Sequence, residues 1–128
     1  RAVEPLLAVV NDKDREVRNQ VAYALWMLND PRAEVVEAFI KLINDECKYV
    51  REIAIHGLSE IGGDHIELFI DKLSDKDYGV RISAIDVLKE LNDKRAIQPL
   101  RDVLENDSSD LVRINAEEAF KKLREKAE

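Results

Sequence analysis

The segment Asp75–Arg81, which reads DKDYGVR, contains a spacing that occurs four times in this chain. In each copy an Asp stands six positions before an Arg, and a Val comes directly before that Arg. Successive arginines are 33, 30 and 32 residues apart, a period typical of stacked supersecondary units rather than of one irregular globule. The four copies are Asp12/Val17/Arg18, Asp45/Val50/Arg51, Asp75/Val80/Arg81 and Asp107/Val112/Arg113.

Apolar residues recur 3, 7 and 10 positions after each Arg, as Val21, Leu25 and Leu28 do after Arg18. These offsets lie on one side of an α-helix. A shorter amphipathic stretch precedes each such helix, with apolar residues three and four positions apart. We therefore predict an all-α fold, an α-α superhelix (solenoid) of about four helical hairpins. The expected helix pairs are 1–13 and 14–29, 31–46 and 47–62, 64–76 and 77–92, and 94–108 and 109–126.

Local signals mark the ends of the second helices. Asp14, Asp77 and Ser109 stand where a side-chain oxygen can cap a helix start, whereas Cys47 takes that place in the second unit and predicts a weaker cap. Asn residues or Gly62 follow the helices and can adopt the left-handed conformation. A small residue six positions after the Arg, such as Gly57, predicts a close approach of a neighbouring helix.

The chain has 128 residues, 45% of them apolar, which is enough for a continuous core. A single hairpin cannot bury its own apolar face, so we expect one repeat domain over residues 1–128, with units at about 1–30, 31–63, 64–93 and 94–128. Because Arg1 enters a unit already under way, we expect a piece of a longer array or a processed chain; the alternative is loss of a few residues.

The net charge of −7 disfavours a nucleic-acid partner, because binding to a polyanion depends on Lys and Arg. It favours a protein or peptide of basic or mixed charge. No apolar run approaches the roughly 20 residues of a membrane span, so we expect no membrane partner. One cysteine, Cys47, cannot form an internal disulfide, and this favours a cytoplasmic, reducing location.

Two segments, RAVEPLLAVVNDKDREVRNQVAYAL and KRAIQPLRDVLENDSSDLVRINAEEAF, resemble HEAT repeats of the short kind found in phycobilin-lyase-like proteins. The resemblance covers the whole chain and implies fold rather than activity. It also implies a structural ladder of hydrogen bonds and ion pairs along the stack. The residues assigned to this ladder are Asp12, Asp45, Asp75, Asp107, Arg18, Arg51, Arg81 and Arg113.

The residue types agree with a structural role for the ladder, because a guanidinium suits a partly buried contact with several carboxylate and carbonyl oxygens. The alternative is that these arginines bind a ligand or act in catalysis. One enzyme that resembles this repeat, deoxyhypusine hydroxylase, carries His-Glu pairs just after its arginines. Here those places hold other residues, such as Asn19 and Gln20, which disfavours that activity.

Offsets of 1, 5 and 8 from each Arg define the solvent side of the second helices, which by the resemblance is the concave face of the superhelix. The one Trp and all three Tyr fall on or near this face. Aromatic residues on a surface that should be polar suggest a contact site; alternatively, Tyr23 and Trp26 pack on an upstream unit or on another copy. The predicted partner-binding residues are Asn19, Tyr23, Trp26, Tyr49, Glu52, His56, Tyr78, Ile82, Asp86, Ile114 and Glu118.

The sequence lacks the patterns of common catalytic sites, and we expect no enzyme activity, cofactor or metal. His56 and His65 are not accompanied by a Cys pair or a metal-binding His-Glu motif. Cys47 at a helix start could be a modestly activated thiol, but no His adjoins it in sequence, so a plain, partly buried Cys is the preferred interpretation.

Three functions remain open. The first is a non-catalytic scaffold that binds a protein or peptide on its concave face, and the second is a substrate-positioning subdomain of a larger enzyme such as a bilin-lyase-like protein. The third, DNA or RNA binding, is disfavoured by the charge. We also expect self-association through the amino-terminal end, because Leu7 and other apolar residues of the first helix would be exposed there.

Overall fold

The computed structural model describes residues 3–127, and within them the chain is all α, with no strand. It divides into two compact units, one ending at Asp64 and the other beginning at His65, which are described separately. The expectation of a single domain over residues 1–128 stays a prediction. The helices are α1 (Val3–Leu7), α2 (Arg15–Leu28), α3 (Ala33–Leu42), α4 (Lys48–Ile61), α5 (Ile66–Lys72), α6 (Tyr78–Leu91), α7 (Ile97–Asn106) and α8 (Asp110–Ala127), with 3₁₀ helices η1 (Gly62–His65) and η2 (Lys94–Ala96).

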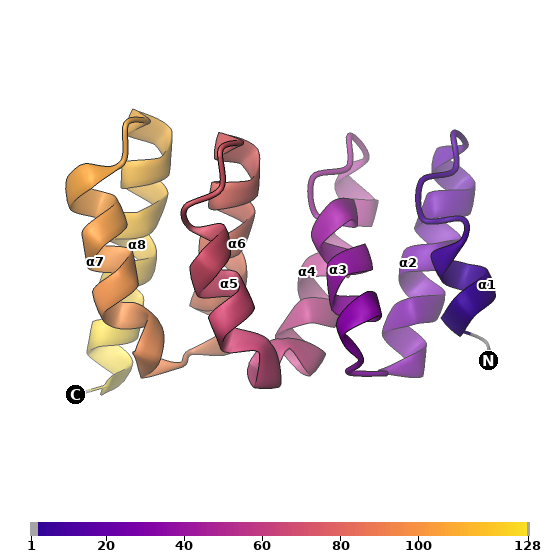
Figure 1. The fold of residues 1–128 in the computed structure, drawn as a ribbon, viewed down its shortest axis with the longest axis horizontal. Helices are drawn as coiled ribbons and strands as arrows, with labels where there is room; N and C mark the ends of the chain where they lie inside the picture. The colour runs from indigo at the N-terminus through magenta and orange to yellow at the C-terminus, as the bar shows by residue number, and fades with distance from the viewer. Residues whose placement is uncertain (1–2, 128) are drawn as a thin grey trace. The chain divides into compact units, whose positions relative to one another are not determined.

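Each unit consists of two helical hairpins. In the first unit α1 pairs with α2 and α3 with α4, and in the second α5 pairs with α6 and α7 with α8 (Figure 1). The second helices of successive hairpins also contact each other, α2 with α4 and α6 with α8. We call the four hairpins repeats 1 to 4. Their order and type confirm the predicted four-hairpin pattern.

The first helices are shorter than predicted, and α1, α3 and α5 each end in a tight turn before the repeated Asp. Residues 1–13 were expected to be helical, but α1 ends at Leu7, and its residues 1 and 2 lie outside the described range. The backbone N–H groups of Asp12, Asp45 and Asp75 each donate to the carbonyl three residues earlier, as in Asp45 N to Leu42 O at 3.0 Å. Such bonds tighten the chain into a turn and end the α-helix.

The turn then starts the second helix with the same Asp. Asp45 Oδ1 accepts the N–H of Cys47 at 2.8 Å, and the other three Asp residues accept the corresponding N–H two positions on. Asp14 and Asp77 cap α2 and α6 as predicted. Cys47 makes no side-chain cap to α4, which confirms the weaker cap.

The predicted left-handed residue after a helix is present at two asparagines but not at the glycine. Asn29 and Asn92 are left-handed, with φ of 51° and 55°, as predicted. Gly62 instead has φ of −82°, so the suggestion of a left-handed Gly62 is wrong. The chain continues there directly into η1, which requires a right-handed turn.

The predicted apolar stripes form the core of each unit. Val21, Leu25, Ala54 and Leu58 are buried in the first unit, and Phe39 packs against Gly57 as the small-residue slot predicts. Leu28 is the exception. It is 43% exposed, whereas Ile61 at the same repeat position is 6% exposed, because α2 covers this side of α4 and none of the described helices covers it on α2.

Candidate partner-binding surface

An aromatic cluster joins α2 and α4 in the first unit. The rings of Trp26 and His56 are stacked, with centroids 5.8 Å apart and planes 19° apart. Tyr23 meets Trp26 edge to face at 5.9 Å and 84°. Trp26 Nε1 donates to Glu60 Oε1 at 2.9 Å, so the indole contacts two aromatic rings and is also held at its polar end. We call Tyr23, Trp26, His56 and Glu60 the aromatic cluster.

The cluster is accessible from outside. Tyr23 is 52% exposed, and His56 and Glu60 are also exposed, while Trp26 is half-buried. The indole of Trp26 is already held in one conformation, so little side-chain entropy is lost when a partner binds. Together with the exposed phenol of Tyr23 it provides the apolar area typical of an interface anchor.

A cleft lies nearby in the first unit, where α2 and α4 begin, with a volume of ≈ 340 Å³. Asn19 contributes a half-buried amide whose Oδ1 has no hydrogen-bond partner among residues 3–127. Tyr49 and Cys47 line the opposite side, the first exposed and the second half-buried. Asn19 and Tyr49 of the predicted face therefore share one cleft, and Glu52 is exposed one turn after Tyr49 on α4.

The predicted residues of the second unit are more varied. Tyr78 and Ile114 are exposed, but Ile82 is half-buried, so its expected exposure is wrong. Asp86 is half-buried on α6, and burial raises the pKa of its carboxyl; Lys89 opposes this, and Glu118 on α8 adds to it. Glu118 is exposed and pairs with Lys89 at 3.8 Å.

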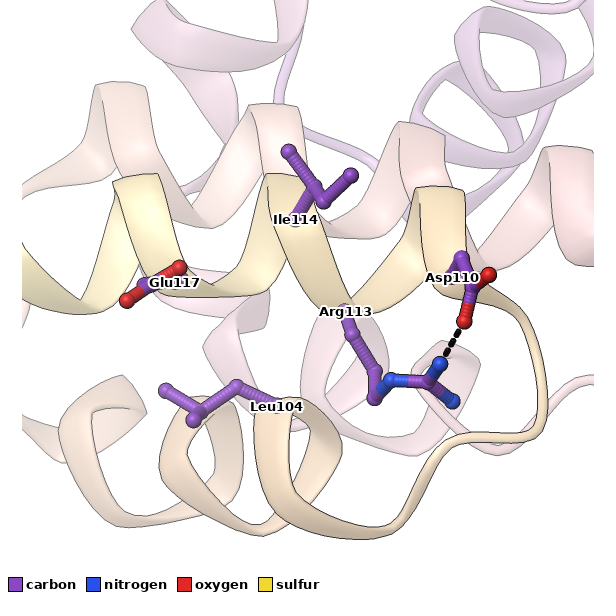
Figure 2. A pocket seen from close by; sticks show the side chains of 5 residues that line it. All are labelled: Leu104, Asp110, Arg113, Ile114 and Glu117. Carbon is purple, nitrogen blue, oxygen red and sulfur yellow. Dashed lines mark ion pairs between the residues drawn. The ribbon is translucent and has the colours of Figure 1, made fainter.

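A second cleft, of ≈ 380 Å³, lies between α7 and α8. Leu104 comes from α7, and Asp110, Arg113, Ile114 and Glu117 come from α8 (Figure 2). Arg113 forms an ion pair with Asp110 on its own helix. We call this cleft the α7–α8 cleft.

The repeated Asp and Arg meet across neighbouring hairpins. Arg18 Nε donates to Asp45 Oδ2 at 2.6 Å, and Arg81 Nε lies 2.9 Å from Asp107 Oδ2. Each Arg also donates to the carbonyl of its own repeat's Asp: Arg18 to Asp12, Arg51 to Asp45, Arg81 to Asp75 and Arg113 to Asp107. In Asp45 and Asp107 the carboxylate therefore pairs with the Arg of the preceding repeat, while the backbone carbonyl accepts from the Arg of its own repeat.

The effect on Asp45 is electrostatic as well as geometric. Burial alone would raise the pKa of this carboxyl, but the hydrogen bonds from Arg18 and the Cys47 N–H outweigh it, and the pKa lies below its ordinary value. The carboxylate is thus held ionised.

A protein-family model described as HEAT repeats matches residues 36–121, two thirds of the chain. The chain belongs to the HEAT-repeat family. Comparison with proteins of curated function found no match.

Solved structures resemble this HEAT-repeat chain in fold. One is in the complex of CpcE and CpcF of phycocyanin lyase from Nostoc sp. PCC7120, with 23% identity, a TM-score of 0.60 and coverage of 92% of this chain and 79% of that one. Another is an engineered protein, with 19% identity, a TM-score of 0.51 and coverage of 96% and 62%. At such identities the likeness shows the fold alone.

Sequence reasoning missed Glu60, the hydrogen-bond partner of Trp26. The solvent side was defined by offsets of 1, 5 and 8 from each Arg. Trp26 lies eight positions after Arg18 and falls on it, whereas Glu60 lies nine positions after Arg51 and does not. The signal was present, because residues 34 apart in a HEAT array of this period occupy neighbouring helices.

Two features are absent from the described part of the chain. Within residues 3–127, no three His, Cys, Asp or Glu side chains are grouped so that they could hold a metal ion. None of the helices in this range combines the length and apolar composition required to cross a membrane.

Proposed function

We propose that this HEAT-repeat chain is a non-catalytic scaffold, and that it binds a peptide or protein segment on the helix faces that carry the aromatic cluster. The observation that supports this most is Trp26, which contacts the rings of His56 and Tyr23 and donates from Nε1 to Glu60, while Tyr23 stays 52% exposed. An indole oriented in this way is not needed to fill the core, because Trp26 is only half-buried.

The charges support a partner of basic or mixed charge, without nucleic acid or membrane. The chain carries −7, and exposed Glu52 lies on α4 with Glu60. An Arg or Lys of the partner can lie on the exposed ring of Tyr23 and approach the carboxylate of Glu60. Lys89 and Glu118 in the second unit pair with each other, so that part of the predicted face is mixed rather than acidic.

A display selection of random peptides tests the proposal. The library is selected against the wild-type chain after depletion on a Tyr23→Ala/Trp26→Ala double variant. We expect enriched sequences with Arg or Lys beside apolar residues. A pool that does not enrich, or that binds both proteins equally, would rule out the aromatic cluster as the site.

The enriched peptides can then be titrated directly, because Trp26 is the only tryptophan and its emission reports on the cluster. Loss of an anchor of this type commonly costs about 2 kcal/mol, so Tyr23→Ala should weaken binding about tenfold or more. Met27→Ala is the matched control, since Met27 is an exposed apolar residue of the same helix outside the cluster.

A second candidate is a substrate-positioning subdomain of a larger enzyme, favoured by the likeness to a phycocyanin lyase complex. Neither proposal makes the chain alone a catalyst. We expect no covalent transfer of a bilin to phycocyanin by the purified chain, and measured transfer would overturn the non-catalytic proposal. Since Cys47 is the sole cysteine, we also propose a cytoplasmic, reducing location.

A further inference from the structure

Within each unit, the junction between its two repeats has a polar Arg–Asp contact. Arg18 of repeat 1 holds the carboxylate of Asp45 in repeat 2, and Arg81 of repeat 3 holds that of Asp107 in repeat 4. In both cases the Arg comes from the earlier repeat and the Asp from the later one. An unmatched Asp on repeat 1 and an unmatched Arg on repeat 4 are therefore the two halves of one more junction.

Both halves are present in this chain. The carboxylate of Asp12 accepts the N–H of Asp14, and no guanidinium among residues 3–127 pairs with it. Arg113 donates to the Asp107 carbonyl but its ion pair is with Asp110, on its own helix. Its side chain is 36% exposed, against 11% for Arg18 and 12% for Arg81.

Repeat 1, which contains Asp12, also carries a row of apolar residues on α2. Val17 and Ala24 are half-buried and Leu28 is exposed, and Met27 beside Leu28 is also exposed. At the same repeat positions α8 carries Val112, Ala119 and Leu123, which are all buried against the hairpin before them. The face formed by Val17, Ala24, Met27 and Leu28, here called the α2 face, therefore has the composition of a repeat junction but no covering helix in residues 3–127. Leu7, expected to be exposed at this end, is half-buried.

The α7–α8 cleft is the opposite face of such a junction. Leu104 of α7 and Arg113 and Ile114 of α8 line it (Figure 2). Glu117 occupies the position that Ala22 fills in repeat 1, where Ala22 is fully buried. The charge of Glu117 is matched by Lys121 at 3.5 Å, so a partner seated there does not meet an isolated charge.

We propose that two copies of this chain associate head to tail. The α2 face of one copy packs on the α7–α8 cleft of the other, and Asp12 of the first receives Arg113 of the second. The occupant is a second copy because the register and the charge of both halves match the Arg18–Asp45 and Arg81–Asp107 junctions inside the two units. Such a contact joins two different surfaces, so it leaves a free half at each end and adds further copies as the concentration rises.

Sedimentation equilibrium of the full 128-residue chain tests the proposal. We expect a weight-average mass that rises above 14.7 kDa, the mass of one chain, and continues past twice that value with increasing concentration. Asp12→Arg and Arg113→Asp should each weaken association at least tenfold, because each places like charges at the contact. Mixing these two variants restores opposite charges at every contact, so the mixture should associate again.

A variant that leaves Asp12 and Arg113 unchanged separates loss of association from loss of folding. Leu28→Glu alters an already exposed residue and should also keep the chain monomeric, with an unchanged far-ultraviolet circular dichroism spectrum. Lys41→Gln, an exposed substitution on α3 with the same change in charge, should associate like the wild type. A wild-type chain that is monomeric at all concentrations, a closed dimer, or a charge-swapped mixture that does not associate would each overturn the proposal.

Discussion

Arg81 on α6 holds both carboxylate oxygens of Asp107, the residue that follows α7. Its Nε lies 2.9 Å from Oδ2, and its Nη2 donates to Oδ1 at 3.1 Å. Both side chains are largely shielded from water, and Oδ1 also accepts the N–H of Ser109 at 2.9 Å. The hairpin of α5 and α6 is thereby fixed to the turn between α7 and α8.

Replacement of Arg81 tests the strength of this contact. Arg81→Met leaves the Asp107 carboxylate shielded and without its cation, which commonly costs about 3–5 kcal/mol. We expect the free energy of unfolding in urea to fall by this amount. Arg101→Gln removes an exposed Arg101–Glu105 pair and should cost less than about 1 kcal/mol. A comparable small loss for Arg81→Met would show that the contact does not hold the repeats together.

Gly57 tests the close approach of α3 and α4. A Cβ at this position would lie 2.5 Å from Cζ of Phe39, a fully buried ring. Gly57→Ala should therefore lower stability by about 1–3 kcal/mol, although alanine favours helix in other settings. Gly63→Ala is the control, because nothing lies within 4 Å of its Cβ and φ is not positive. Thermal unfolding of both variants should separate them, and an equal or higher midpoint for Gly57→Ala would contradict the packing.

Cys47 tests the cap of α4. Its backbone, with φ of −87° and ψ of 123°, matches that of Asp14 at −81° and 119°, yet its side chain accepts no hydrogen bond from the first turn of α4. Cys47→Ser supplies an oxygen acceptor in the right conformation and should raise the free energy of unfolding by roughly 0.5–1 kcal/mol. Cys47→Ala, which removes the sulfur without adding an acceptor, is the matched comparison. No difference between the Ser and Ala variants would show that the first turn of α4 is satisfied by water.

Asp86 tests the effect of pH. Burial raises the pKa of its carboxyl in the folded chain, so ionisation of Asp86 above that pKa opposes folding. Asp86→Asn should therefore stabilise the chain at pH 7, and the gain should shrink as the pH falls through the folded pKa and vanish below the unfolded value of about 3.9. Thermal unfolding at a series of pH values gives the measurement. A gain that grows toward low pH would mean that the sign is wrong.

The pKa of Asp45 is shifted in the opposite direction to that of Asp86. Its pKa is lowered in the folded chain, against the effect of burial, by the hydrogen bonds from Arg18 and the Cys47 N–H. The resulting stability is complete above the unfolded pKa of about 3.9 and is lost as the pH falls through the folded value. In an Asp45→Asn variant the acid loss of stability should therefore be smaller than in the wild type.

The repeated Asp–Val–Arg spacing was sufficient to predict the fold, because each copy determines a turn, a cap and a buried stripe at the same time. Helix lengths were less predictable. The turn at Asp12 ends α1 at Leu7 through bonds between backbone groups that carry no side-chain signal. Gly62 shows the same limit, since a glycine permits a left-handed turn without requiring one.

The candidate surface was less predictable than the core. The offsets from Arg18 placed Tyr23 and Trp26 on one helix face, but a helix face does not show which partner a side chain selects. Trp26 bonds to Glu60, one position beyond the counted offsets, because the long indole reaches across to the next hairpin. Leu28 was assigned to the core because burial was inferred from helix geometry alone, whereas burial also requires a neighbour.

Asp45 and Asp107 each bond to two hairpins, because the carboxylate accepts from the Arg of the preceding hairpin and the main-chain oxygen accepts from the Arg of its own. A duplication that breaks the chain inside a hairpin would separate these groups. A break at the left-handed Asn29 or Asn92 instead carries a whole Asp–Arg set with it. Insertions of one full period at those asparagines should thus fit into the array without any new type of contact, so its length can change in evolution without a redesign of its joints.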